Sequence, residues 1–194
     1  MNVPSSRQMR RWQRVIIGID PGTNVMGYGV LGLASRTPEV IDLGAIKFKA
    51  TESHYLRLRR IHESVLRLVE QFLPDEMAIE APFFGKNVQS MLKLGRAQGV
   101  AMVAALSRDV PITEYEPRKI KMAITGNGAA SKEQVQEMLR RILKIEREAL
   151  PAELDASDAL AVALTHYYES ARPQKTAGPH SWKEFIARNP DKVR

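Results

Sequence analysis

The feature that most constrains the fold is a short apolar run that ends in an acid and a turn. The run spans residues 15–19 and consists mainly of β-branched side chains, which is typical of a strand buried on both faces. Asp20 follows it, and Pro21 and Gly22 then turn the chain. Because an uncompensated charge is costly in a core, we expect Asp20 to project from a strand end into a crevice. The alternative is an ordinary surface turn of Asp-Pro-Gly composition.

Apolar periodicity divides the rest of the chain into strands and helices. With 194 residues, 44% of them hydrophobic, the chain is long enough for one domain with a substantial core. The period is strand-like in four further segments and helical in five others. The expected strands are residues 26–33, 39–48, 77–79 and 110–115, and the expected helices are residues 55–72, 86–107, 118–124, a capped helix after Ser131 and a last helix over 154–170.

A second strand also ends in an acid. The apolar run 77–79 is followed by Glu80, and Pro82 then breaks the strand, which repeats the arrangement around Asp20. If the two strands lie side by side in one sheet, both carboxylates reach the same edge. The sequence therefore predicts a pair of acids at one edge of the sheet.

The last helix supplies two more acids. Asp155 and Asp158 are three residues apart in its first turns and therefore lie on one face. Like charges at this spacing repel, so the pair indicates either a bound cation or a capping role. Together with Asp20 and Glu80 they form a possible all-oxygen site of the kind that binds Mg²⁺ or Mn²⁺. Two such ions can activate water and stabilise the leaving oxygen at a phosphodiester.

Composition excludes several other chemistries. The chain has no cysteine, so it has no disulfide or thiolate site, and its four histidines are scattered along the sequence. No apolar run approaches the roughly 18 residues needed to span a bilayer, which predicts a cytoplasmic protein with no membrane partner. The formal net charge is +7, and both ends are basic. Residues 1–14 and 171–194 are expected to be mostly disordered tails that either bind a polyanion or only aid solubility; an organellar targeting role for the first is a weaker alternative.

Two helices carry further candidate features. The helix 86–107 has Gly95 and Gly99 on one face, where glycine costs roughly 1 kcal/mol each relative to alanine. Close packing against the core or against another subunit would offset this cost. Basic residues gather around the helix 118–124 and the start of the next one, and they form either a solvated face or an anion-binding surface. These residues are Arg118, Lys119, Lys121 and Lys132.

Four motifs in order resemble one known family. They are GIDPGT at 18–23, AIEAPFF at 78–84, KN and LKLGRAQGV within 86–100, and LDASDALAVALTH at 154–166. This set is similar to the RuvC family of bacterial Holliday-junction resolvases and covers roughly residues 15–170. The resemblance implies an α/β, RNase H-like fold with a five-stranded mixed sheet flanked by helices. It also implies a homodimer that nicks two opposed strands of four-way junction DNA symmetrically, with two Mg²⁺ ions per site for which Mn²⁺ can substitute, and with RuvA and RuvB as partners.

The resemblance also implies roles for individual residues. Asp20, Glu80, Asp155 and Asp158 match the family's catalytic, metal-binding acids. Phe83 matches an aromatic that stacks on a base, against the alternative of core packing. Lys121 and Lys132 match basic residues near the cut phosphate, while Gly95 and Gly99 match the dimer interface. His166 matches a histidine after the acids, but it lies too far along the helix and is expected to be structural.

Three other readings remain. The GIDPGT motif also resembles the first phosphate motif of actin-like ATPases and sugar kinases, but that fold needs a second domain and a second phosphate loop. Another RNase H-like nuclease, such as a YqgF-type RNA-processing enzyme or an RNase H, is a nearer alternative. A junction-binding scaffold that does not cut is disfavoured, because unneeded acids at a DNA surface would only weaken binding.

Overall fold

A computed structural model describes residues 11–34, 37–49, 51–82, 87–146, 154–171 and 186. Of the predicted tails 1–14 and 171–194, residues 1–10 and 172–194 lie outside the described residues, apart from Ile186, and so does the aromatic Phe83. The expected disorder is wrong for Arg14, which begins a strand, and for Ala171, which ends a helix. The described strands are β1 (Arg14–Asp20), β2 (Val25–Leu33), β3 (Glu39–Lys47), β4 (Glu76–Glu80) and β5 (Ile112–Tyr115). The described helices are α2 (His54–Phe72), α3 (Val88–Leu106), α4 (Pro117–Thr125), α5 (Lys132–Leu143) and α6 (Leu154–Ala171).

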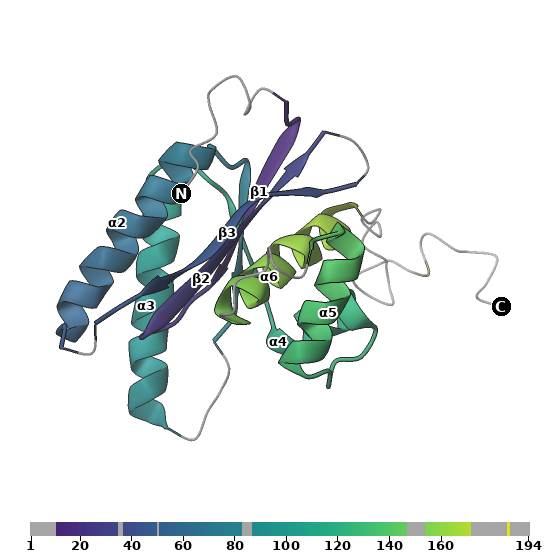
Figure 1. The fold of residues 1–194 in the computed structure, drawn as a ribbon. Helices are drawn as coiled ribbons and strands as arrows, with labels where there is room; N and C mark the ends of the chain where they lie inside the picture. The colour runs from purple at the N-terminus through teal and green to yellow at the C-terminus, as the bar shows by residue number, and fades with distance from the viewer. Residues whose placement is uncertain are drawn as a thin grey trace.

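The strands form one mixed sheet, as the sequence predicts. Their order is β3-β2-β1-β4-β5, with β1 antiparallel to β2 and β2 antiparallel to β3. Strand β4 is parallel to both β1 and β5. Helices α2 and α3 cover one face of the sheet, and α4, α5 and α6 cover the other (Figure 1). Strands β1, β3, β4 and β5 therefore end at the same edge of the sheet, which we call the acid edge, and α2 and α3 begin there.

Strand β1 has a different function on each of its faces. Ile17 and Ile19 belong to the core under α2 and α3, whereas Ile16 belongs to the core under α6. With the two-residue period of a strand, Gly18 and Asp20 lie on the α6 face with Ile16. Both isoleucine-lined faces are fully buried, which explains why the run is continuously apolar rather than alternating.

Local sequence signals set the helix ends. Ser131 and Gln134 form the predicted capping box at the start of α5, with the Ser131 side chain accepting from the Gln134 amide. Helix α3 begins at Val88, two residues later than predicted, because Asn87 is its N-cap. The N-terminal side of the sheet begins before β1: Trp12 packs on the core, and the Gln13 amide donates to the Leu33 carbonyl over 2.8 Å. Within the described residues, no helix has the length and apolar content to cross a membrane.

Candidate active site

The register of the sheet brings Asp20 and Glu80 together. Parallel strands β1 and β4 pair Gly18 with Ala78 and Ile19 with Ile79, so the next residues of the two strands are neighbours at the acid edge. Ala78 belongs to the core on the α6 side, and Glu80 lies on the same face two residues later. The two strand-end carboxylates therefore lie side by side, as the sequence predicts, and both face α6.

Glycines let α6 approach this part of the sheet. A Cβ atom on Gly18 would lie 2.1 Å from the Ala159 carbonyl oxygen, and one on Gly27 would lie 1.9 Å from the Asp155 carbonyl oxygen. No side chain fits at such separations, so both positions require glycine. Gly27 is also the strand partner of Asp20. The first turn of α6 thus lies against the two strands at the position where Asp20 leaves the sheet.

The electrostatics show that all four acids share one site. The pKa of Asp20 is raised to about 8, mainly by burial and also by the charges of Glu80, Asp158 and Asp155, against the opposing effect of Lys132. Burial likewise raises the pKa of Glu80 to about 7, assisted by the charge of Asp158. The charges of Asp155 and Asp158 thus act on the carboxylates at the strand ends, which places all four acids in one electrostatic cluster.

Two lysines border the same cluster. Lys132, at the start of α5, forms an ion pair with Asp158, and they line a small cavity of about 50 Å³ with Glu80 and Lys121. Although burial opposes it, the hydrogen bond and charge of Asp158 raise the pKa of Lys132. The positive charge of Lys121 acts on Glu80. Lys121 and Lys132 are therefore next to the acids, as the sequence predicts.

The other predicted basic residues lie in the first turn of α4. Lys119 Nζ pairs with a Glu169 carboxylate oxygen over 2.8 Å and sits 5.2 Å from the centre of the Tyr115 ring. The aliphatic part of Arg118 lies against Gly128, where an added Cβ would be 2.8 Å from the Arg118 Cγ. Both side chains thus have contacts within the chain, and their role in DNA binding stays a prediction.

The donor set suits a hard divalent cation, although the side chains are not arranged around one. Carboxylate oxygens are the ligands that Mg²⁺ and Mn²⁺ prefer. Within the described residues, no three acidic or histidine side chains are grouped tightly enough to hold an ion as they stand. The cation found on Asp158 is the Lys132 ammonium group. Mutual repulsion among buried acids is nevertheless the condition that a bound divalent cation relieves.

The sequence did not reveal the residues that support the acids from behind. Gln98, buried in α3, donates to the Glu80 backbone carbonyl over 3.3 Å and to the Glu114 carboxylate over 2.9 Å. The signal in the sequence is a glutamine on a helix face that otherwise consists of small residues. Its hydrogen-bond partners could not be predicted, because they lie in strands distant in sequence. Gln98 therefore fixes the end of β4 from the α3 side of the sheet.

A buried polar network holds α6 farther along the helix from the four acids. His166 Nδ1 is 2.8 Å from the Tyr115 hydroxyl, and its Nε2 contacts the Glu76 carboxylate, which also pairs with Arg14. The hydrogen bonds from Arg14 and His166 lower the pKa of Glu76, against the effect of its burial. His166 is buried, and its hydrogen bonds go to residues other than the four acids of the site, in agreement with the structural role expected for it.

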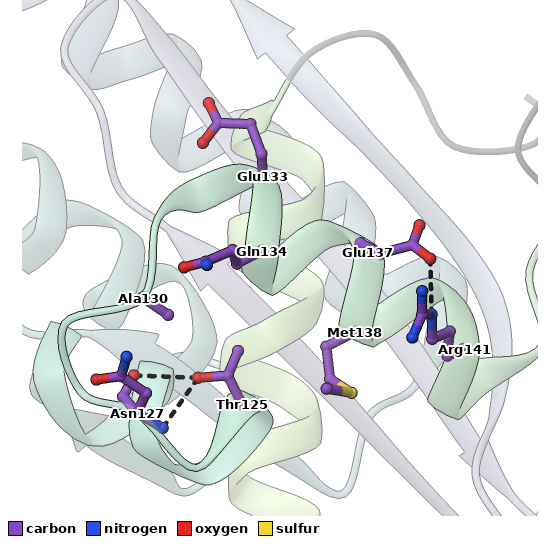
Figure 2. A pocket seen from close by; sticks show the side chains of 8 residues that line it. All are labelled: Thr125, Asn127, Ala130, Glu133, Gln134, Glu137, Met138 and Arg141. Atoms are coloured by element: carbon purple, nitrogen blue, oxygen red, sulfur yellow. Dashed lines mark hydrogen bonds and ion pairs between the residues drawn. The ribbon is translucent and has the colours of Figure 1, made fainter.

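A larger cavity than the one beside the two lysines lies elsewhere. It has a volume of about 470 Å³ and is formed by the loop after α4 and one side of α5 (Figure 2). Thr125 and Asn127 hydrogen-bond each other at one end, and Glu137 pairs with Arg141 at the other. None of the four acids lines it. The size of a cavity does not identify the chemical site in this molecule.

Comparison with known proteins identifies the family. The sequence profile of the family described as "Crossover junction endodeoxyribonuclease RuvC" matches residues 16–166. The chain belongs to the RuvC family. A RuvC protein of Bacteroides fragilis is 60% identical over 182 residues, which cover 94% of this chain and 97% of that protein. A second, from Porphyromonas gingivalis, is 57% identical over 94% of this chain and 98% of its own length.

Solved RuvC structures have the same fold. RuvC of T. thermophilus in complex with a Holliday junction substrate superimposes with a TM-score of 0.74 at 34% identity, over 81% of this chain and 95% of that one. The yeast mitochondrial Holliday junction resolvase Ydc2 gives a TM-score of 0.60 at 14% identity, over 86% of this chain and 85% of its own, a likeness of fold alone. The expected RNase H-like fold with a five-stranded mixed sheet is confirmed.

Proposed function

We propose that this chain is a metal-dependent endonuclease that resolves Holliday junctions during recombination and DNA repair by nicking two opposed strands symmetrically. The observation that carries the proposal is the meeting of Asp20, Glu80, Asp155 and Asp158 at one edge of the sheet, in a chain of the RuvC family. A solved relative is bound to a Holliday junction, which supports four-way junction DNA as the substrate.

The four acids would hold two Mg²⁺ ions, for which Mn²⁺ substitutes. Such ions supply activation of a water on one side of a phosphodiester and stabilisation of the leaving oxygen on the other. Asp20 and Glu80 would bind the ions from the strand ends, and Asp155 and Asp158 would bind them from α6. Lys121 and Lys132 line the small cavity that also contains Glu80 and Asp158, and their ammonium groups would contact the phosphate that is cut.

An exposed apolar stripe on α3 supports a homodimer. Gly95 and Gly99 have no atom within 4 Å of an added Cβ, so neither packs against the described part of its own chain. Apolar side chains continue the same face above and below them, each between 51% and 65% exposed: Val88, Leu92, Val103 and Leu106. This observation favours the subunit interface over the core packing that the sequence left open. Two copies joined here would provide two acid sites, one for each strand that is cut.

The remaining assignments rest on the family resemblance and on charge. Phe83 would stack on a base near the junction centre, and Arg118 and Lys119 would contact the backbone. The domain would extend slightly beyond the expected residues 15–170, because Trp12 packs on the core and α6 ends at Ala171. The remaining basic tails would bind the flanking polyanion. RuvA and RuvB would be the partners that move the junction, and the cytoplasm the place of action.

The test is cutting of a synthetic four-way junction compared with a duplex of the same arms. Purified protein is incubated with Mg²⁺, with Mn²⁺ or with EDTA, and nicks are mapped on all four strands. We expect paired symmetric nicks in opposed strands, on the junction only and with metal only. Metal-dependent cutting of duplex, hybrid or RNA would assign the site to another RNase H-like nuclease, and tight binding without cutting would favour a scaffold.

A further inference from the structure

A second polar pocket opens at the acid edge, on the other side of the sheet. It has a volume of about 300 Å³ and lies between the turn after β1 and the first turns of α2 and α3. Both helices begin at this edge, so the positive ends of their dipoles also point to it. Its lining residues are Thr23, Asn24, Glu52, His54, Arg57, Ser90 and Lys93.

Arg57 is fixed in this pocket by the turn that follows Asp20. Its Nη1 donates to the Thr23 carbonyl over 3.0 Å and to the Asn24 side-chain oxygen over 2.9 Å, and its Nη2 donates to the Lys49 carbonyl over 3.1 Å. All three acceptors are uncharged. These bonds hold the guanidinium in place.

The pocket also contains basic groups that lack partners. Lys93 is exposed and forms no ion pair with any residue that the structure describes. The Nε2 atom of His54 is covered, yet it has no hydrogen-bond partner among those same residues. Burial lowers the pKa of His54, and the positive charges of Arg96, Lys93 and Arg57 lower it further. The surroundings of His54 are thus strongly positive.

One acid lines the pocket, but its charge is already balanced. Glu52 Oε1 pairs with Arg60 Nη1 over 2.6 Å, and Arg60 is not part of the lining. The Glu52 Oε2 atom has no partner within the described residues. With that pair neutral, the exposed ammonium group of Lys93 gives the lining a positive charge, which favours an anion over a cation.

We propose that this pocket binds a phosphate group of the junction backbone, next to the one that is cut. Thr23 is three residues after Asp20, so their Cα atoms are at most about 11 Å apart. A strand whose phosphate lies at the acids therefore passes this pocket within about one or two nucleotides. The pocket would anchor the cut strand from the α2 side, while Lys121 and Lys132 contact it from the α6 side. This inference rests on the proposed function, because it takes the same DNA as ligand.

The test combines Lys93→Ala with junctions in which one phosphate at a time is a neutral methylphosphonate. Binding is measured in EDTA, so that nothing is cut. Arg108→Ala is the matched control, because it removes the same charge just beyond the opposite end of α3, where Arg108 pairs with Glu70 at the surface. Circular dichroism confirms that both variants fold.

We expect Lys93→Ala to weaken binding of the unmodified junction about 3- to 10-fold and to lower the slope of log K against log salt by about 0.9. One methylphosphonate position beside the cut site should weaken wild-type binding, yet have no further effect on Lys93→Ala. Arg108→Ala should respond to that position as wild type does.

Two results overturn the inference while leaving the proposed function intact. Equal losses for Lys93→Ala and Arg108→Ala would mean that Lys93 contributes only to the general field of the protein. If every methylphosphonate weakens binding of Lys93→Ala as much as it weakens binding of the wild type, Lys93 contacts no single phosphate. If the wild-type protein with Mg²⁺ does not nick the junction at all, the proposed function itself fails. Cutting is measured in a separate reaction from binding, so the two outcomes are distinguishable.

Discussion

Two pairs of glycines in this molecule have opposite surroundings. Gly18 and Gly27 lie under α6, where an added Cβ would come within 2.1 Å of the helix backbone. Gly95 and Gly99 lie on the outer face of α3, where an added Cβ would meet nothing within 4 Å. The first pair is explained by contacts within the chain, and the second is not. A glycine inside a helix that has no close neighbour in its own subunit therefore points to a contact with another molecule.

The largest effect is expected from removing the charge of Asp20, which lies beside the close contact between α6 and the strands. Asp20→Asn should reduce cutting by about 10³-fold or more, because it removes charge from an ion site worth several kcal/mol to the transition state. Junction binding in EDTA should persist, since the lysines are unchanged. Loss of binding along with cutting would instead make Asp20 a structural residue. Asp109→Asn, an exposed acid whose φ of 57° suits asparagine, is the control for charge alone.

The same variant should also change stability in a pH-dependent way. The folded-state pKa of Asp20 is raised from 3.8 to about 8, so the folded protein binds more protons than the unfolded chain between these values. Wild-type stability without metal should therefore fall as pH rises from about 4 to about 8. Asp20→Asn lacks this loss, and at pH 8 its Tm should be about 5 °C higher. A thermal melt series in EDTA measures the difference, and a constant offset across pH would contradict it.

Gly27→Ala breaks the tight contact directly. The new methyl group would lie 1.9 Å from the Asp155 carbonyl, so α6 must shift away from the strands. We expect about 3 kcal/mol less unfolding free energy in urea, together with cutting reduced about 100-fold at temperatures where the variant is folded. Unchanged cutting by a destabilised variant would show that the acids tolerate a shift of α6.

The open glycines should respond in the opposite direction. Replacing both Gly95 and Gly99 by Ala should raise the unfolding free energy of the monomer by about 1–2 kcal/mol, since alanine favours helix and meets no clash. Dimerisation should weaken, because the added methyl groups separate the two copies of α3. Sedimentation over a concentration series measures it, and unchanged association would place the interface elsewhere.

The smallest effect is expected from removing the positive charge of Lys121, which lies next to the acids. Lys121→Ala should weaken junction binding a few-fold and lower the salt slope by about 0.9, since one phosphate contact is lost. Lys119→Ala is the comparison variant, because its ammonium is paired with Glu169 and should lose less affinity. A Lys121→Ala slope equal to wild type would exclude the phosphate contact.

The sequence predicted the parts of the site that follow from local pattern. An apolar run that stops at an acid identifies Asp20 and Glu80, because strand length and burial are visible in a window of a few residues. Helical spacing identifies Asp155 and Asp158 in the same way. To bring Asp20 and Glu80 together, β1 and β4 then had only to be neighbours. In the structure these two strands are adjacent and parallel.

Contacts between distant segments could not be predicted in this way. The partners of Gln98 are in β4 and β5, and His166 meets Glu76 ninety residues away in sequence. Nothing in either local window specifies the other residue. The glycines of β1 and β2 were visible as residues, but their purpose depends on which helix lies over them. The second pocket is likewise assembled from three separate segments.

The alternation along β1 also determines which length changes the gene can tolerate. Ile16, Gly18 and Asp20 face α6, while Ile17 and Ile19 face the opposite core. Deleting or inserting a single codon within this strand would exchange the two faces, sending an isoleucine against the α6 backbone and the carboxylate toward the α2 side. Length variation among natural descendants of this chain should therefore accumulate in the connections between elements and be absent from residues 15–20.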